Sequence, residues 1–422
     1  MSSSSAEPVS AANDIDGPAA WFRLLVAVAL GTIGGVGSWS VVVVLPAVQA
    51  DFGVARGDAS LPYTMAMIGL AVGGVFLGKV TDRIGIMLPV AGAGIMIGLG
   101  YLVAGLAPNI WIFALAHGLF IGMVGAAVVL GPLMADVSLW FNRRRGIAVA
   151  LCACGNYLAG GIWPQAVRFM LDAYGWRVTH FIIAGIVVAT MTPLALLLRR
   201  RAPAAVPAAG PAGPVTRPRA DAMPLGLPPN VLMAALFVAG VACCVAMAMP
   251  QVHIVAYCAD LGYGVARGAE MLSLMLGLGI ISRIGTGFIA DRIGGLAALL
   301  LASCLQGVAL LLFLTSSELT SLYIFSALFG LFQGGIIPCY AIIVREYFPP
   351  GEAAYRVGVV LMATLIGMAL GGWLSGVIYD LTRSYQAAFV NGILWNAVNL
   401  TTVGWLLWRR ERLARNAALQ AS

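Results

Sequence analysis

Long apolar stretches separated by short polar segments dominate the chain. A helix needs about 20 apolar residues to cross a hydrocarbon core about 30 Å thick. The pattern predicts twelve membrane-spanning helices, at residues 22–47, 61–80, 86–106, 109–138, 146–171, 178–198, 229–258, 268–290, 294–315, 319–345, 354–378 and 386–408. We therefore expect an all-α membrane protein.

The polar segments divide these helices into two sets of six. Residues 199–228 are rich in Pro, Ala and Gly and have basic ends, which is typical of a flexible cytoplasmic linker. Residues 1–20 are polar and acidic, which predicts a disordered cytoplasmic tail rather than a cleaved signal. The remaining units are a first six-helix bundle at 21–198, a second at 229–408 and a cytoplasmic tail at 409–422.

Composition narrows the class of protein further. Of the 422 residues, 61% are hydrophobic and 10% are charged, whereas soluble domains carry about 25% charged residues. So few charges exclude a soluble fold, a disordered chain, a coiled coil, a secreted disulfide scaffold and a nucleic-acid binder, and they make the lipid bilayer the expected surroundings. The seven cysteines lie in apolar stretches at spacings unlike a zinc or disulfide pattern, so we expect no metal and no cofactor.

The basic residues predict the orientation. With the N-terminus inside, eighteen of the 24 lie in cytoplasmic segments and five in outer ones. Because short cytoplasmic loops carry an excess of Lys and Arg, this distribution predicts a multi-pass protein of the inner, or plasma, membrane with both termini in the cytoplasm.

A short motif occurs twice. Residues 78–85 and 287–294 both read Gly-x-x-x-Asp-Arg-Ile-Gly, 209 residues apart, after the second and the eighth predicted helix. A parallel six-helix repeat is a layout of transporters whose two bundles rock around a central site. We expect the acidic–basic pairs of the motif to engage helix ends at the cytoplasmic boundary and so to bias one access state; a generic surface pair in a tight turn is the alternative. The pairs are Asp82 with Arg83 and Asp291 with Arg292.

One arginine belongs to neither side of the membrane. Arg283 lies eight residues before Asp291, about 12 Å into the membrane at 1.5 Å per residue. A charge at that depth costs on the order of 3 kcal/mol, so it predicts function. A guanidinium offers two parallel donors to a carboxylate, and the residue one turn earlier is Gly279 rather than an acid. We expect Arg283 to bind a substrate carboxylate; a structural ion pair with a distant helix is the alternative.

Histidine and tyrosine supply further candidates. His253 lies seven residues before Asp260, about 10 Å from the outer boundary, and Tyr257 is one turn away on the same face. This histidine can hydrogen-bond a hydroxy or keto group or carry a proton. Five further residues are candidates to line the cavity, and for each of them a role in helix packing is the alternative. They are His117, Tyr340, Asn156, Tyr157 and Tyr63.

Asp136 lies near the inner end of the fourth predicted helix, close in sequence to three consecutive arginines. A gating ion pair between Asp136 and that cluster is the favoured interpretation, and a proton relay is the alternative. The cluster consists of Arg143, Arg144 and Arg145.

Several stretches resemble a known family. The doubled motif and the span of residues 22–408 are similar to the major facilitator superfamily. Within it, the chain resembles the monocarboxylate transporters and the bacterial oxalate/formate-type antiporters, in Trp140–Ala148, in Gln251–Tyr257 followed by Asp260–Gly262, in Ser282–Arg283, and in Gly371–Gly376 followed by Tyr379–Asp380 and Ser384–Tyr385.

The resemblance implies a secondary transporter with two rocking bundles, in which an arginine at the position of Arg283 binds the substrate carboxylate. Oxalate-type relatives use a second basic residue in the eleventh helix, but here that helix has only Arg356, at its cytoplasmic edge. We therefore expect a small monocarboxylate, such as lactate, pyruvate or a similar 2-hydroxy or 2-oxo acid, rather than a dicarboxylate.

The sequence leaves open how transport of the substrate is coupled to protons or to a second anion. Animal relatives carry a lysine in the first helix and an aspartate in the eighth, and this chain has neither. Proton symport is favoured over uniport and exchange, since an anion alone moves against an inside-negative potential. Carboxylate exchange of the oxalate/formate type is the main alternative, and a membrane enzyme or sensor a distant one. A monomer is expected, with a weak dimer as the alternative.

Overall fold

The computed structural model describes residues 15–200 and 224–421, and these ranges are helical almost throughout, without a strand. The first half of the chain forms α2 (Pro18–Gly34), α3 (Val36–Phe52), α4 (Arg56–Ala59), α5 (Leu61–Ile84), α6 (Met87–Gly105), α7 (Ile110–Ala116), the π-helix η1 (His117–Ala126), α8 (Ala127–Ser138) and α9 (Arg145–Leu196). The second half forms the 3₁₀ turn η2 (Pro224–Gly226), α10 (Pro229–Asp260), α11 (Gly264–Ile293), α12 (Gly295–Leu312), α13 (Leu319–Gln333), α14 (Ile336–Tyr347), α15 (Pro350–Thr382) and α16 (Tyr385–Ala421).

These helices account for the twelve predicted spans. Ten stretches of the described chain are long and apolar enough to cross a membrane. One of them, Gly146–Leu196, holds two predicted spans, which are separated at Gly175 by a non-helical backbone with φ 76° and ψ 168°. The remaining span is α16, whose hydropathy is lowered by asparagines such as Asn396 and Asn399. The expectation of an all-α membrane protein is confirmed.

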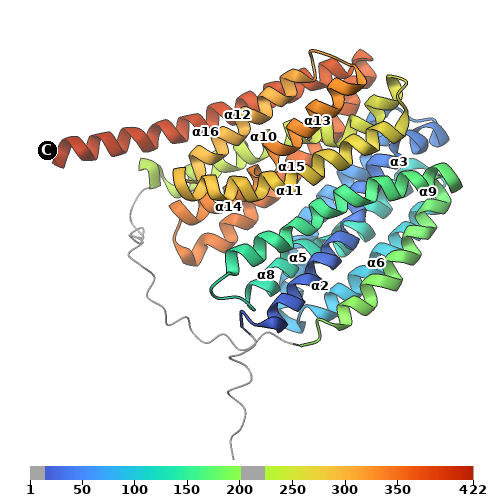
Figure 1. The fold of residues 1–422 in the computed structure, drawn as a ribbon, viewed down its shortest axis with the longest axis horizontal. Coiled ribbons are helices and arrows are strands. Elements are labelled where there is room, and N and C mark those ends of the chain that lie inside the picture. The colour runs from blue at the N-terminus through green and yellow to red at the C-terminus, as the bar shows by residue number, and fades with distance from the viewer. Residues whose placement is uncertain (1–14, 201–223, 422) are drawn as a thin grey trace, which may run out of the picture.

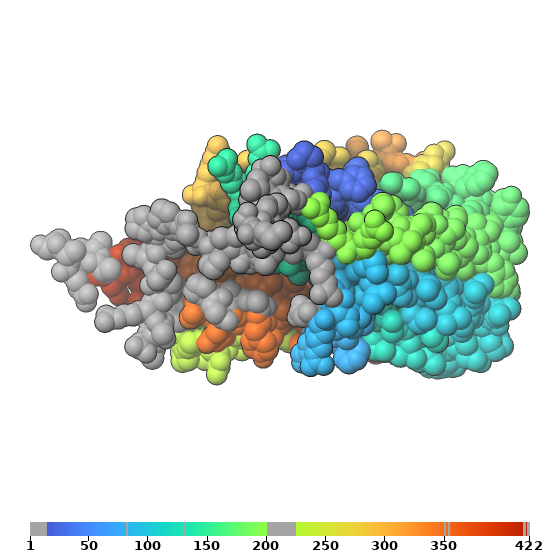
Figure 2. Space-filling model, turned by 90° about the horizontal axis from the view of Figure 1, so that it is seen from below, coloured from blue at the N-terminus to red at the C-terminus, as the bar shows by residue number. Residues whose placement is uncertain are grey.

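The two halves form two bundles that lie side by side. Figure 1 shows the blue-to-green first half next to the yellow-to-red second half, and α16 projecting beyond its bundle at the C-terminus. Figure 2 shows α6 and the end of α9 adjacent on one face of the first bundle, in agreement with their contacts. Between the bundles, α9 packs along α11 and α5 packs along α15. We call the end where α9 ends and α10 begins the linker end, and the opposite end the distal end.

The close helix contacts repeat between the bundles. In the first, α5 packs against η1, where a β-carbon at Gly69 would overlap the carbonyl oxygen of Gly118. In the second, the equivalent pair α11 and α13 meets at Gly330, where a β-carbon would overlap the carbonyl oxygen of Met275. Small residues let membrane helices approach this closely. The internal repeat of the sequence is thus also a repeat of packing.

The predicted tails differ from the structure at their boundaries. Residues 1–14 and 201–223, which fall in the predicted tail and linker, lie outside the described residues. Helix α2 begins at Pro18, within the predicted tail, and the carboxylate of Asp16 accepts hydrogen bonds from the backbone N–H groups of Asn142 (3.2 Å) and Arg143 (3.0 Å). Partial burial opposes ionisation of Asp16, but these bonds together hold its pKa below the usual value. At the other end, α16 continues as a helix through the predicted tail to Ala421.

Candidate functional site

Arg283 lies on α11 at the interface between the bundles. Its Nε donates to the carbonyl oxygen of Gly334, and its Nη1 donates to that of Ala153, both at 3.3 Å. The guanidinium carbon stands 4.3 Å from the ring centroid of Tyr157. Because Ala153 and Tyr157 belong to α9 of the first bundle, this arginine joins the two halves of the molecule.

Glycines give Arg283 these neighbours. A β-carbon at Gly279, one turn earlier on α11, would overlap the ring of Tyr157, so the glycine leaves room for that ring. Gly334 stands between α13 and α14, where the interrupted helix offers a carbonyl oxygen as an acceptor. In the described part of the chain, no carboxylate forms an ion pair with Arg283. Two backbone carbonyls and a ring face therefore leave its positive charge uncompensated.

A second set of polar residues lies at the distal end, where it connects the two bundles. The Nη2 of Arg56 donates to both carboxylate oxygens of Asp260, at 3.1 and 3.2 Å, and its Nη1 donates to the hydroxyl of Tyr385 at 2.8 Å. The backbone N–H groups of Arg56 and Gly57 donate to the carboxylate of Asp380 at 2.8 and 2.7 Å. We call Arg56, Asp260, Asp380 and Tyr385 the distal cluster.

The distal cluster ties the bundles together. Arg56 belongs to α4 of the first bundle, whereas its three partners belong to the second. A further ion pair crosses between the bundles nearby, from Arg168 on α9 to Glu270 near the start of α11, at 3.9 Å. Both contacts lie at the distal end, since α10 ends at Asp260 and α11 begins at Gly264.

His253 belongs with the distal cluster rather than with Arg283. It is fully buried, and its Nε2 lies 2.8 Å from the carbonyl oxygen of Gly372, to which it donates. Its Nδ1 lies 3.5 Å from the hydroxyl of Tyr385. Tyr257 packs its ring against Tyr385, with the ring centroids 5.2 Å apart, and the ring of Tyr63 lies against Gly372. The structure thus brings three predicted residues together around Gly372 and Tyr385, apart from the contacts of Arg283.

Two other predicted residues lie inside single bundles. His117 is fully buried in the first bundle, where its Nδ1 donates to the carbonyl oxygen of Phe113 at 2.9 Å and its ring lies 5.9 Å from that of His180. Tyr340 is fully buried in the second bundle, where its hydroxyl donates to Asn399 at 3.5 Å. In the described part of the chain, neither residue has a hydrogen bond to Arg283.

The two candidates of the fifth predicted helix, Asn156 and Tyr157, have different neighbours in the structure. The backbone carbonyl of Asn156 accepts a hydrogen bond from the indole of Trp39 at 3.1 Å. It is the adjacent Tyr157 whose ring faces Arg283. A helix turns about 100° per residue, so neighbouring positions face different helices, and the sequence leaves open which of the two faces inward.

The expected partner of Asp136 differs from the observed one. Its carboxylate forms a two-pronged ion pair with Arg23 on α2, at 2.7 and 2.9 Å, instead of pairing with the arginine cluster. Arg23 also donates to the carbonyl oxygen of Arg200 at 2.9 Å and lies over the ring of Trp140. The physical reason is burial: Arg23 is only 5% exposed and faces the carboxylate across the helix contact, while Arg143 is exposed to solvent.

The repeated motif lies at the linker end. A cavity of about 760 Å³ is lined there by Gly78 and Gly85 of the first copy together with Arg23 and Asp136. The exposed residues of this region include Arg83, Asp291, Arg292, Arg143 and Arg144. The side chains of Asp82 and Arg145 lie outside the described part of the structure.

The distal cluster is not evident from the sequence. Arg56 counted only toward the orientation of the chain, and Asp380 and Tyr385 only toward the family resemblance. The sequence does place Arg56 on the outer side, and it places Asp260 and Asp380 at the outer ends of the seventh and eleventh predicted helices, so an ion pair among them was one possible prediction. Which of these side chains meet depends on the tertiary arrangement of the bundles.

The chain is similar to known membrane transporters. The family model described as "Major Facilitator Superfamily" matches residues 27–317 and, in a second match, 287–422. Monocarboxylate transporter 13 of Rattus norvegicus is 27% identical over 77% of this chain and 75% of its own length, and the MFS-type transporter pynF of Aspergillus niger is 23% identical over 76% and 72%. The crystal structure of the peptide transporter POT in complex with sulfate superposes with a TM-score of 0.74 at 13% identity, covering 96% of this chain and 98% of that one.

Proposed function

Because the chain belongs to the Major Facilitator Superfamily, it is a membrane transporter rather than an enzyme, and we propose that it moves a small monocarboxylate by alternating access. The substrate class is a lactate- or pyruvate-like 2-hydroxy or 2-oxo acid. Arg283 binds its carboxylate, and a proton travels with it.

The state of Arg283 carries this proposal. The hydrogen bonds found for it use two of the five N–H donors of a guanidinium, and both acceptors are neutral carbonyls. A partly buried cation without a counter-ion is costly, so an anion that enters between the bundles gains a charge-assisted, two-pronged contact. The ring of Tyr157 on the other bundle makes the same anion sensitive to the relative position of the two halves.

A single carboxylate suits this site better than two. The arginine of α15, the eleventh predicted helix, is Arg356, which pairs with Glu352 at 2.6 Å and lies over the ring of Phe348, near the start of the helix. It is therefore committed at the linker end. Short apolar acids need few polar groups beyond the carboxylate anchor.

Coupling to protons is proposed through the distal end. His253 is linked by Tyr385 to Arg56, and thus to the contact that holds the bundles together there. Protonation of this imidazole places a second positive charge near Arg56 and weakens the closed distal end. An outside-acid pH gradient then favours opening on the side from which the proton enters.

We also propose that the linker end faces the cytoplasm, in the plasma membrane. The exposed arginines at this end, among them Arg143, Arg144, Arg292 and Arg412, support this orientation because cytoplasmic boundaries are enriched in basic residues. Labelling of single introduced cysteines with a membrane-impermeant reagent tests it. Labelling of Asn142→Cys in intact cells would contradict the orientation.

Arg283→Lys tests the anchor. The lysine keeps the charge but loses the planar fork, so we expect uptake of lactate or pyruvate into proteoliposomes to fall at least tenfold, while thermal unfolding stays unchanged. Arg415→Lys on the exposed end of α16 is the control and should transport normally. Wild-type uptake by Arg283→Lys would overturn the anchor.

A panel of short organic acids, with binding measured by thermal shift, identifies the substrate. Strong stabilisation by oxalate, together with exchange in preloaded vesicles, would favour antiport of dicarboxylates instead.

A further inference from the structure

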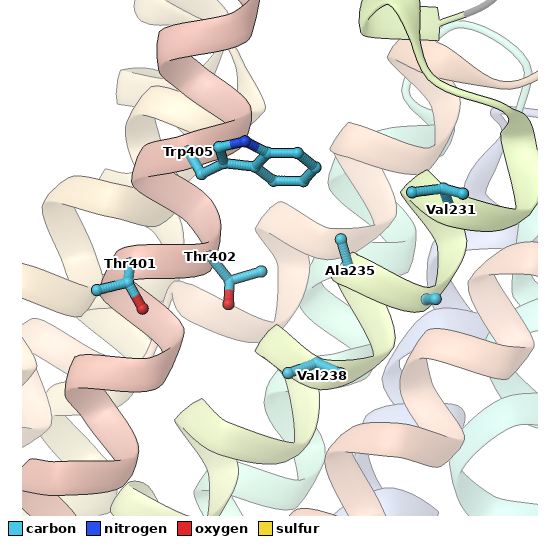
Figure 3. A pocket seen from close by; sticks show the side chains of 7 residues that line it. Val231, Ala235, Val238, Thr401, Thr402 and Trp405 are labelled. Atoms are coloured by element: carbon cyan, nitrogen blue, oxygen red, sulfur yellow. The ribbon is translucent and has the colours of Figure 1, made fainter.

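A groove on the outside of the second bundle lies between α10 and α16. Its volume is about 490 Å³, and Figure 3 shows the two helices on opposite sides of it, with the indole of Trp405 projecting from α16 toward Val231 of α10. The groove shares no residue with the Arg283 site or the distal cluster. Its labelled lining residues are Val231, Ala235, Val238, Thr401, Thr402 and Trp405.

The walls of this groove are hydrocarbon. Val231 and Val238 are 44% and 47% exposed, and they stand two turns apart on α10, about 10 Å at 1.5 Å per residue. The hydroxyls of Thr401 and Thr402 donate to carbonyl oxygens of their own helix, at 2.9 and 2.8 Å. Their methyl groups therefore remain as the surface, which suits an alkyl chain.

The linker end of the groove is basic. Arg409 and Arg412 follow Trp405 by one and two turns on the same side of α16. Helical side chains lean toward the N-terminus of their helix, and accordingly the guanidinium of Arg409 lies 5.4 Å from the ring of Trp405 and that of Arg412 lies 5.3 Å from the ring of Trp408. Arg409 is thus turned toward the groove, and Arg412 follows on the same side of α16 about one turn further.

These charges are only partly satisfied. Arg409 donates to the carbonyl oxygens of Leu225 and Gly226 at 3.2 Å, which fixes it beside the groove without neutralising it. Arg412 is exposed and has no ion-pair partner in the described part of the chain. A second copy docked on this face by a twofold axis would bring the same arginines together, so an anionic occupant fits better than another protomer.

We propose that this groove binds one anionic diacyl phospholipid. An acyl chain lies between α10 and α16, the indole of Trp405 stands at the level of the glycerol backbone, and Arg409 and Arg412 bind the phosphate. Tryptophan prefers that interfacial level, and each basic residue near an anionic headgroup contributes about 1 kcal/mol, or roughly a fivefold change in affinity.

Lipid retention by the purified full chain tests the site. The protein is exchanged into detergent containing phosphatidylglycerol or phosphatidylcholine with identical acyl chains, and bound lipid is counted by native mass spectrometry. We expect one phosphatidylglycerol per protein to survive conditions that remove phosphatidylcholine. Arg412→Gln should weaken its retention about fivefold, and Val238→Phe, which fills the groove, should abolish it.

Matched controls separate this site from general lipid contact. Arg410→Gln removes the same charge about 200° around α16, and Val308→Phe enlarges an equally exposed valine on α12; both should retain phosphatidylglycerol like the wild type. Equal retention of the two headgroups, equal losses in Arg410→Gln and Arg412→Gln, or a dimer that hides the groove would each overturn the proposal. The count does not depend on the transported substrate, so failure here leaves the proposed function standing.

Discussion

Arg56 and Arg283 show how neighbours decide what one side chain does. Arg56 is surrounded by the carboxylate of Asp260, the hydroxyl of Tyr385 and the ring of Tyr379, so its charge is balanced. Arg283 meets two carbonyl oxygens and a ring, so its charge is not. The first arginine therefore holds the structure together, whereas the second is available to an anion.

Arg56→Gln is expected to open the distal end. The side chain of Arg56 is 8% exposed and that of Asp260 30%, and removing one partner of a largely buried pair leaves an uncompensated charge. In a double-mutant cycle with Asp260→Asn, measured by unfolding in detergent, we expect a coupling of about 1–3 kcal/mol. Additive effects of the two changes would show that the pair contributes nothing beyond its separate residues.

His253→Gln probes the proposed proton step. Glutamine retains a donor toward the carbonyl oxygen of Gly372 but does not titrate. We expect unchanged binding of the substrate by thermal shift, because Arg283 is elsewhere, together with uptake that no longer rises with outside acidity. An uptake-versus-pH profile identical to that of the wild type would place the proton on another group.

At the scale of helices, close packing is set by glycines that repeat between the bundles. Gly330 allows α13 to reach the backbone of α11, as Gly69 does for α5 and η1. Such contacts are intolerant of an added atom because the neighbour is backbone, which cannot rotate away.

Gly330→Ala should destabilise the second bundle by about 1–3 kcal/mol, since its β-carbon overlaps the carbonyl oxygen of Met275. Thermal unfolding in detergent measures the effect. Gly358→Ala on α15 is the control, because a β-carbon there meets nothing within 4 Å. Similar unfolding temperatures for both variants would mean that α13 shifts without penalty.

The helices were predictable from the sequence because apolar length alone identifies a membrane span. The break at Gly175 lies between the predicted spans 146–171 and 178–198, whereas the continuation of α16 through the predicted tail was not marked by hydropathy. Contacts were harder: Asp136 has Arg23, 113 residues away, as its partner, and His253 has Gly372. The position of a polar residue within its span gives its depth in the membrane. Which neighbouring helix its side chain faces depends on how the helices and bundles pack.

At the scale of the molecule, ion pairs join the two bundles at the distal end, whereas the cavity at the linker end is lined by the first bundle. Arg56–Asp260 and Arg168–Glu270 both cross between the bundles. The ion pair of Arg23 with Asp136, in contrast, stays within the first bundle. In the proposed alternating-access cycle, we expect such an asymmetry in the state that is closed at the distal end.

Spin labels at Asn142→Cys and Arg292→Cys, with exposed Cys304 replaced by serine, report the separation of the bundles at the linker end. We expect the distance to shorten when Arg56→Gln and Glu270→Gln are combined, because release of the distal end lets the linker end close. A distribution unchanged by the two substitutions would show that these ion pairs do not bias the equilibrium.

The two ion pairs that cross between the bundles differ in their contact with water, so dissolved salt acts on them to different extents. The two acids are similarly exposed, Glu270 at 32% and Asp260 at 30%, but the side chain of Arg168 is 29% exposed and that of Arg56 only 8%. Dissolved ions screen an accessible pair over about 8 Å at physiological ionic strength, but act far less on a sheltered one. We therefore expect the salinity on the distal side to change how often the molecule opens there in the proposed transport cycle, mainly through the Arg168–Glu270 pair.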